Sequence, residues 1–136
     1  MAFSPILNDI ELMRPPEGTA YSFTADEDVL AGQAVKISSD NSVAPSDTDG
    51  EQVIGVCAQS VAAGDTVMVL GDGARVRMRA GTAVTAGSQV ASHGATGEEG
   101  EVADAASADH SVAIAHEGAS GGDTFVGTVA TAGGKN

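Results

Sequence analysis

From Tyr21 onward the chain consists of short apolar or alternating runs separated by Gly, Asp and Ser. Such runs are typical of strands joined by tight turns, because successive side chains of a strand point to opposite faces. Stretches with helical spacing are short, and the best of them covers residues 104–109. The pattern predicts an all-β fold, either a small β-barrel or a β-sandwich-like domain with tight Gly and Asp turns. The predicted strands cover residues 34–38, 52–58, 66–70, 74–79, 111–116 and 124–130.

A hairpin is predicted between residues 66–70 and 74–79, joined by Gly71, Asp72 and Gly73. The Asp-Gly pair supplies the positive φ values that a tight hairpin turn needs. We therefore expect these two strands to be neighbours in one sheet.

The second strand of that hairpin alternates basic and apolar residues. Arg75, Arg77 and Arg79 are expected on one face, with Val76 and Met78 on the other. Two interpretations stay open. The arginines could balance acids on neighbouring strands of their own sheet, or they could form a subunit or partner interface, because guanidinium groups pair well with carboxylates.

A short motif recurs four times: a small residue, a Gly, and an apolar residue three positions after the Gly. Each copy is interpreted as a turn whose Gly adopts a conformation that other residues resist, followed by a strand directed into the core. The glycines are separated by 32, 23 and 35 residues, so a solenoid of equal repeats does not fit. The motif glycines are Gly32, Gly64, Gly87 and Gly122, and the apolar residues are Val35, Val67, Val90 and Phe125.

The N-terminal residues differ from the rest of the chain. Residues 1–21 are predicted to form an extended arm, since Pro15 and Pro16 forbid a continuing helix. Residues 22–131 are predicted to form the β-rich domain, and residues 132–136 a flexible tail. The arm also carries six apolar residues, Phe3, Ile6, Leu7, Ile10, Leu12 and Met13.

Length and charge narrow the functional classes. The chain has 136 residues, and its 19 acidic and 6 basic residues give a formal charge of −13. Nucleic acids and anionic membranes are poor partners for such a chain, because binding them relies on clustered Lys and Arg. The length suits a single domain with one core, built from small side chains because only four residues are aromatic. The strong negative charge suggests a halophilic host or virus, since salt screens self-repulsion.

The N-terminus has neither a basic start nor a long apolar stretch, which predicts no signal peptide and no membrane helix, and synthesis in a host cytoplasm. Cys57 is the single cysteine and lies in an apolar run, where we expect it to be a buried small hydrophobe. An enzyme that pairs Cys57 with His93, His110 or His116 is the least favoured interpretation, because no electropositive loop surrounds the thiol. No cofactor or zinc site is expected, since no second ligand stands at a zinc-site spacing beside any histidine.

Two acidic loops offer a different function. Asp47, Asp49 and Glu51 have the carboxylate density of a calcium loop but lack its twelve-residue spacing. The loop from Glu98 to Glu101 is similar. Both are expected to be solvated turns, and the alternative function is an acidic calcium-binding surface or adhesion module.

The succession of these turns and strands resembles a known family, the capsid cement or head decoration proteins of tailed phages. The resemblance covers residues 22–130 and includes Val29 to Ile37, Val53 to Cys57, Ala62 to Val69, Ala86 to Val90 and Ala119 to Asp123. Together with the acidic composition, the resemblance suggests a protein from a tailed virus of haloarchaea. It implies a non-enzymatic structural protein on the outer surface of the virion head. It also implies a homotrimer that bridges subunits of the major capsid protein, and on this resemblance we expect the six apolar residues of the arm to contact the capsid.

Overall fold

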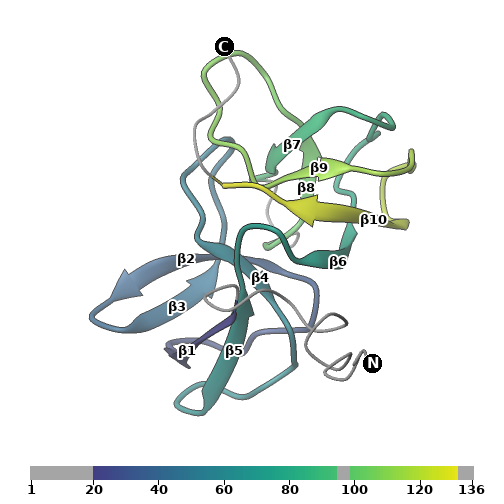
Figure 1. Ribbon diagram of the computed structural model, residues 1–136. Coiled ribbons are helices and arrows are strands. Elements are labelled where there is room, and N and C mark those ends of the chain that lie inside the picture. The colour runs from purple at the N-terminus through teal and green to yellow at the C-terminus, as the bar shows by residue number, and fades with distance from the viewer. Residues whose placement is uncertain (1–19, 95–98, 132–136) are drawn as a thin grey trace, which may run out of the picture.

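The computed structural model describes residues 20–94 and 99–131, and every regular element within them is a strand. The strands form two five-stranded units, stacked one above the other in Figure 1. The first is a closed barrel with the order β1-β3-β2-β4-β5, here called the N-terminal barrel. The second has the order β6-β10-β9-β7-β8 and is here called the C-terminal sheet. The predicted all-β fold with a small barrel is confirmed.

All six predicted strands overlap observed ones, and four further strands (β1, β3, β7 and β8) escaped prediction. The strand β1 begins at Ala20, so it includes the last two residues of the predicted arm. Residues 1–19 and 132–136 lie outside the described residues. The N-terminal barrel contains β1 (Ala20–Ala25), β2 (Ala34–Ser39), β3 (Ser42–Pro45), β4 (Gly55–Cys57) and β5 (Thr66–Leu70). The C-terminal sheet contains β6 (Arg75–Arg79), β7 (Gln89–Ser92), β8 (Val102–Asp104), β9 (Ala113–Ala115) and β10 (Thr124–Val129).

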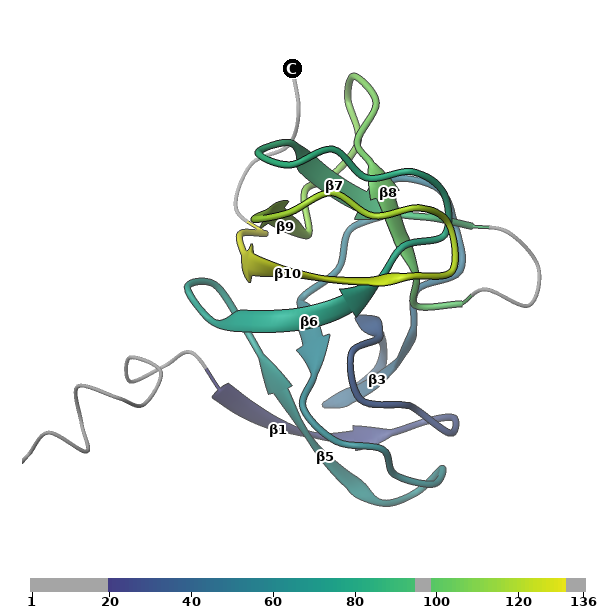
Figure 2. The ribbon, with the colours of Figure 1, turned by 90° about the vertical axis from the view of Figure 1, so that its right-hand side faces the viewer.

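The prediction of a hairpin between β5 and β6 is wrong. The strand β5 pairs with β1 and β4, whereas β6 pairs with β10, so the turn between them passes from one unit to the other (Figure 2). The turn itself forms as expected, since Gly73 has a φ of 93° and the amide of Ala74 donates to the carbonyl of Gly71 at 3.1 Å. The Gly and Asp residues therefore predicted the turn at residues 71–73 correctly, but they did not predict which strands pair.

Residues 104–109, the best candidate for a helix, do not form one. Asp104 ends β8, and its carboxylate accepts hydrogen bonds from the amide of Thr85 at 3.0 Å and the hydroxyl of Ser88 at 2.6 Å. The segment continues as a turn in which Ala108 has a φ of 74°. A left-handed residue inside the segment ends any helical path.

The four recurring motifs form the same turn. Their glycines have φ values of 93°, 93°, 84° and 89°, a region that glycine enters without a steric penalty. Each turn is followed by a strand, and the residue three positions after the glycine is fully buried. This confirms the predicted role of the motif. The turns lead into β2, β5, β7 and β10.

The two units are copies of one arrangement. Phe23 faces Val67 in the N-terminal barrel, and Met78 faces Phe125 at the corresponding place in the C-terminal sheet. The pairings β1·β5, β5·β4, β4·β2 and β2·β3 recur as β6·β10, β10·β9, β9·β7 and β7·β8. The parallel contact that closes the barrel at β1 and β3 recurs as a single parallel bridge between Ala80 and Val102.

This duplication explains the uneven spacing of the motif glycines. Gly32 corresponds to Gly87, 55 residues later, and Gly64 corresponds to Gly122, 58 residues later. The repeating unit is thus about twice as long as the distance between consecutive turns, and alternate turns are the equivalent ones. The long period is the reason that no solenoid pattern appears in the sequence.

A single core was expected, and the buried residues instead form two clusters. One fills the N-terminal barrel, and the other fills the C-terminal sheet and extends to Ala34, Val53 and Val56. Ala34 and Val56 alternate with residues that face the barrel interior, so they lie on its outer surface. The C-terminal sheet covers this surface, which packs the two units together. As predicted, the side chains are mostly Val and Ala, with Phe125 and Met78 the largest fully buried ones.

Candidate interface in the cleft between the two units

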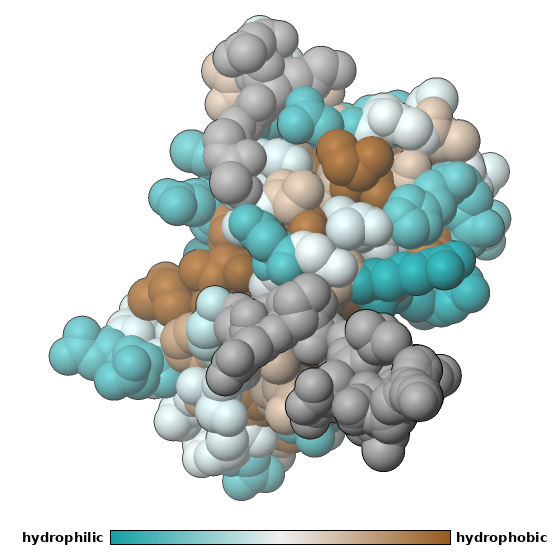
Figure 3. All heavy atoms as spheres, viewed as in Figure 1, coloured by the Kyte–Doolittle hydropathy of each residue, from teal (hydrophilic) through white to brown (hydrophobic). Residues whose placement is uncertain are grey.

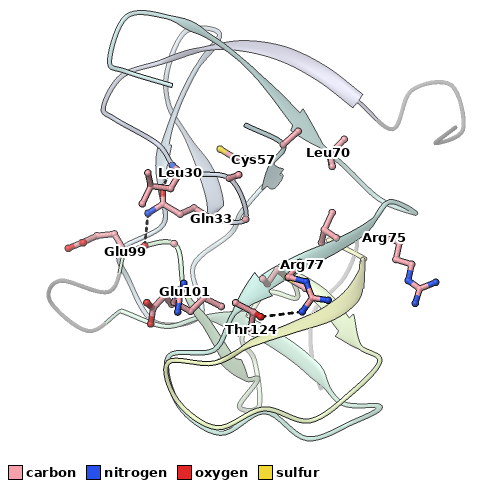
Figure 4. A pocket seen from close by; sticks show the side chains of 16 residues that line it. Leu30, Gln33, Cys57, Leu70, Arg75, Arg77, Glu99, Glu101 and Thr124 are labelled. Atoms are coloured by element: carbon pink, nitrogen blue, oxygen red, sulfur yellow. Dashed lines mark hydrogen bonds between the residues drawn. The ribbon is translucent and has the colours of Figure 1, made fainter. Parts of the chain in front are cut away.

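A cleft of about 740 Å³ opens between the two units. One wall is the turn before β2 together with the ends of β4 and β5, and the other wall is β6 (Figure 4). Its apolar lining includes Leu30, whose surface is 60% exposed, and Leu70. All three arginines of the predicted stripe line it as well. The cleft therefore combines exposed apolar surface with most of the positive charge of the described residues.

The alternation predicted for β6 is confirmed. Arg75, Arg77 and Arg79 are exposed, while Val76 and Met78 are buried. Arg77 donates through Nη1 to the hydroxyl of Thr124 at 3.2 Å. Arg79 donates through Nη1 to the carbonyl of Gly122 at 2.5 Å. Because a guanidinium carries five donors, most of them stay available for a partner.

The strand that pairs with β6 carries no acids opposite the arginines. Arg75, Arg77 and Arg79 face Thr128, Val126 and Thr124 of β10. The interpretation that the stripe balances cross-strand acids of its own sheet therefore has no support in the register.

The duplication provides an internal comparison for the stripe. The residues of β1 at the positions equivalent to Arg75, Arg77 and Arg79 are Ala20, Ser22 and Thr24. The same strand position thus accepts small neutral side chains in the N-terminal barrel. The fold does not require arginine there, and this favours an interface role for the stripe.

Carboxylates occupy the other end of the cleft. Glu99 and Glu101 lie beside Gln33, whereas Arg75 lies at the opposite end and points away from them (Figure 4). Gln33 donates through Nε2 to the carbonyl of Glu99 at 3.0 Å, and its Oε1 accepts from the amide of Leu30 at 2.8 Å. These bonds fix the turn that carries Leu30, so this wall of the cleft is held in place by its own polar groups.

Cys57 lies in the cleft wall on β4, and its surface is 2% exposed. Burial raises the pKa of its thiol to about 11, so the thiol stays protonated at neutral pH. None of the histidines lines the cleft among the residues that the structure describes. His116 instead contacts the hydroxyl of Thr128 through Nε2 at 2.7 Å. Cys57 is a buried hydrophobe, as predicted, and a thiolate nucleophile is disfavoured.

Two carboxylates of the first acidic loop converge on the ammonium of Lys36, which lies 2.6 Å from Asp47 and 3.5 Å from Glu51. The hydrogen bond from Lys36 lowers the pKa of the Asp47 carboxyl below its usual range. Glu51 also accepts from the amides of Asp47 at 2.6 Å and Thr48 at 3.0 Å, and Asp49 accepts from the amide of Gly94 at 2.6 Å. Groups of the protein itself therefore pair with all three carboxylates, which leaves the calcium interpretation without support.

Within the described ranges, no group of three or more His, Cys, Asp and Glu side chains is placed to hold a metal ion. The same residues contain no helix of the length and hydrophobicity that a membrane crossing needs. Glu98 of the second acidic loop and the six apolar residues predicted for the arm lie outside the described residues.

Sequence reasoning missed the partners of the arginine stripe in the cleft. Leu30 and Gln33 belong to the first recurring motif, and Leu70 ends a predicted strand. Their place beside β6 depends on how the two units stack, which no local pattern reports. The one available signal was Leu30, a large apolar residue two positions before a turn glycine, where the equivalent residue of the C-terminal sheet is Thr85.

Comparisons with known proteins concern the fold. No protein-family model matches the chain, and no curated protein matches it either. Among solved structures, the chain is similar to the N base of the head fiber gp8.5 in bacteriophage phi29, with a TM-score of 0.63 and 16% sequence identity. The match covers 82% of this chain and 93% of that chain. At this identity the similarity establishes a shared fold that spans both units.

Proposed function

We propose that the protein is a structural component of a tailed-virus head, bound to the outer surface of the capsid as a decoration protein or as the base of a fiber. The observation that carries this proposal is the fold shared with a phage head fiber base over 93% of that chain. The resemblance of the sequence to head decoration proteins points the same way and rests on different features.

The chemistry of the described residues agrees with a binding role. The cleft offers exposed leucine and arginine side chains, which suit protein interfaces, and its one thiol is buried and protonated. A formal charge of −13 carries no penalty on the outside of a particle, away from the packaged genome. A non-enzymatic role in the virion accounts for these features together.

The proposed partner is the major capsid protein, and the proposed assembly is a homotrimer that bridges its subunits. The apolar residues of the arm, from Phe3 to Met13, would supply the capsid contact. A small core of Val and Ala gains stability when such an arm buries further apolar surface on a neighbour. Segments of this kind commonly order when they bind.

Co-sedimentation with undecorated capsids tests the proposal directly. The purified protein is mixed in molar salt with heads of the virus that encodes it, and the copies bound per capsid subunit are counted. Saturation near one copy per capsid subunit supports trimers at three-fold positions. The absence of binding, with a monomer in solution, would refute the proposal.

Two variants separate the contributions of the arm and the arginine stripe. Deletion of residues 2–16 is expected to weaken attachment to capsids while the oligomer measured by sedimentation equilibrium stays unchanged. The triple variant R75A/R77S/R79T removes the arginine stripe from the cleft and gives β6 the residues found at the equivalent positions of β1. Unchanged capsid occupancy after the deletion would rule out the arm as the attachment element.

A further inference from the structure

The arm contains a short segment whose pattern is complementary to β6. Residues 9–12 read Asp-Ile-Glu-Leu, so in an extended conformation Asp9 and Glu11 share one face and Ile10 and Leu12 the other. The strand β6 presents arginines at the same spacing of two. When the segment lies alongside β6, Asp9 and Glu11 can therefore each face one arginine of that strand.

The cleft matches both faces of that segment. Arg75 and Arg77 offer guanidinium groups for the two carboxylates, and the exposed Leu30 and the partly buried Leu70 offer apolar surface for Ile10 and Leu12. The Arg75 side chain has no hydrogen bond or ion pair within the described ranges, unlike Arg77 and Arg79. Arg75 also lies at the end of the cleft away from Glu99 and Glu101 (Figure 4). The carboxylates of an acidic segment are attracted to this end, and Leu30 lies toward the other end.

The arm is also attached beside the cleft. Ala20, the first residue of β1, is paired with Leu70, which lines the cleft and is followed by the turn into β6. Seven residues lie between Leu12 and Ala20, and the extended chain between these two can span up to about 26 Å. Pro15, Pro16 and Gly18 lie between them and are residue types that favour a reversal of the chain.

We propose that residues 9–12 of the arm occupy the cleft of their own chain, with Asp9 and Glu11 paired to Arg75 and Arg77 and with Ile10 and Leu12 against Leu30 and Leu70. The strand β6 is then the internal partner of the arm. Docking residues 9–12 leaves Phe3, Ile6 and Leu7 to extend beyond the cleft. This inference concerns the free protein and does not depend on the capsid role.

Charge and hydrophobicity on the surface agree with this choice of occupant. On the face shown in Figure 3, hydrophobic residues (brown) are exposed at the level where the two units meet and also over the C-terminal sheet. Exposed apolar surface beside a cluster of charges is typical of a docking site. A tethered segment reaches it at a high effective concentration, so weak contacts suffice.

Paramagnetic relaxation enhancement in the full-length protein tests the proposal. A nitroxide is attached to N8C, which labels selectively because the thiol of Cys57 is buried. We expect the amide signals of Leu30, Arg75 and Arg77 to broaden, while those of residues 39–42, at the far end of β2 and β3, stay sharp. The absence of broadening in the cleft would overturn the proposal.

Isotope mixing distinguishes the chain's own arm from that of a neighbour. An excess of spin-labelled protein without ¹⁵N is mixed with ¹⁵N-enriched protein that carries no spin label. No broadening is expected in the mixture. Broadening of Arg75 and Arg77 there would overturn docking within one chain and assign the cleft to the arm of another copy.

Charge-matched variants test the chemistry of docking. The double change D9N/E11Q is expected to reduce the enhancement at Arg75 about fivefold, by loss of two exposed ion pairs. The control D40N/D65N changes the formal charge by the same amount on exposed residues away from the cleft and should leave the enhancement unchanged. An equal reduction in both variants would show a general effect of net charge and contradict the specific pairing.

Discussion

The N-terminal barrel and the C-terminal sheet share one topology but differ in what they present to solvent. At equivalent positions, β1 carries Ala20, Ser22 and Thr24, whereas β6 carries Arg75, Arg77 and Arg79. Their interiors are closely matched, since Phe23 and Val67 take the places of Met78 and Phe125. The duplication thus separates residues that the fold requires from residues that only one copy has, and the second group is where function is expected.

The two copies also differ in how firmly each is closed. The barrel closes through two parallel pairs between β1 and β3, and the C-terminal sheet closes through one bridge next to β6. The arginine stripe lies beside this weaker closure. The proposed interface residues therefore lie beside the closure at which the two copies differ.

The largest expected effect concerns the interior residue that follows each turn. Phe125→Ala removes the largest fully buried side chain and should lower the free energy of unfolding by about 3–5 kcal/mol. Val67→Ala at the equivalent position removes fewer atoms and should cost clearly less. Urea denaturation monitored by circular dichroism measures both, and an equal loss would show that the two cores are not organised alike.

A second comparison uses equivalent glycines. Gly87→Ala places a methyl group in open space but keeps a φ of 84°, so it should cost about 1–2 kcal/mol of strain. Gly32→Ala has a φ of 93° and also brings the methyl group to 2.9 Å from the carbonyl oxygen of Arg77. We expect the Gly32 variant to lose more stability and to perturb the contact between the units. Chemical shifts of β6 in that variant provide the check, and unperturbed β6 signals would contradict it.

A buried hydroxyl offers a stabilising change. The Oγ of Ser46 is buried and has no hydrogen-bond partner among the described residues. At the equivalent position the C-terminal sheet has Ala105. Ser46→Ala should therefore raise the free energy of unfolding by about 1 kcal/mol, as the desolvation penalty disappears. A lower melting temperature in calorimetry would be the contrary result.

A smaller effect, dependent on pH, is expected from the ion pair between Lys36 and Asp47, which the C-terminal sheet lacks because Ala91 and Ala106 replace them. The hydrogen bond from Lys36 lowers the pKa of Asp47 below its usual value of 3.8. Its stabilisation is therefore present above that pH and is lost as pH falls through the lowered pKa. Because the pair is largely exposed, Asp47→Asn should cost less than about 1 kcal/mol near neutral pH. Melting curves of both proteins should converge in strong acid.

The smallest effect on stability is expected from R75A/R77S/R79T. These side chains are exposed and their counterparts in β1 are small and neutral, so unfolding should change by no more than about 0.5 kcal/mol. Thermal denaturation measures this alongside the relaxation experiment described above. A large loss of stability would show that the stripe is structural and would remove the argument from the duplication.

The sequence predicted local features well and long-range ones poorly. Gly32, Gly64 and their counterparts were found because a positive φ leaves a residue-type signature. The alternation of Arg75 to Arg79 was found because a strand has period two. In contrast, residues 66–70 and 74–79 looked like one hairpin, since nothing local distinguishes a turn within a sheet from a turn between two units.

The duplication and the cleft were beyond sequence reasoning for a related reason. Arg75 and Ala20 are equivalent in space but share no chemistry, so the copies cannot be aligned by residue type. Leu30 reaches β6 only through the stacking of Ala34 and Val56 on the C-terminal sheet. The four missed strands are short or mixed in polarity, and β8 has three residues, fewer than a pattern needs to be recognised.

The pairing of the first strand of each unit with its last strand has a consequence for synthesis on the ribosome. The strand β1 can pair only after β5 has been synthesised, about 45 residues later, and β6 can pair only after β10, at a similar separation. Neither unit can close until its final strand has left the exit tunnel, so folding proceeds in two delayed steps. The nascent N-terminal barrel, once closed, offers Ala34 and Val56 as an uncovered apolar surface until the second unit follows, and this interval is when the chain is most exposed to aggregation.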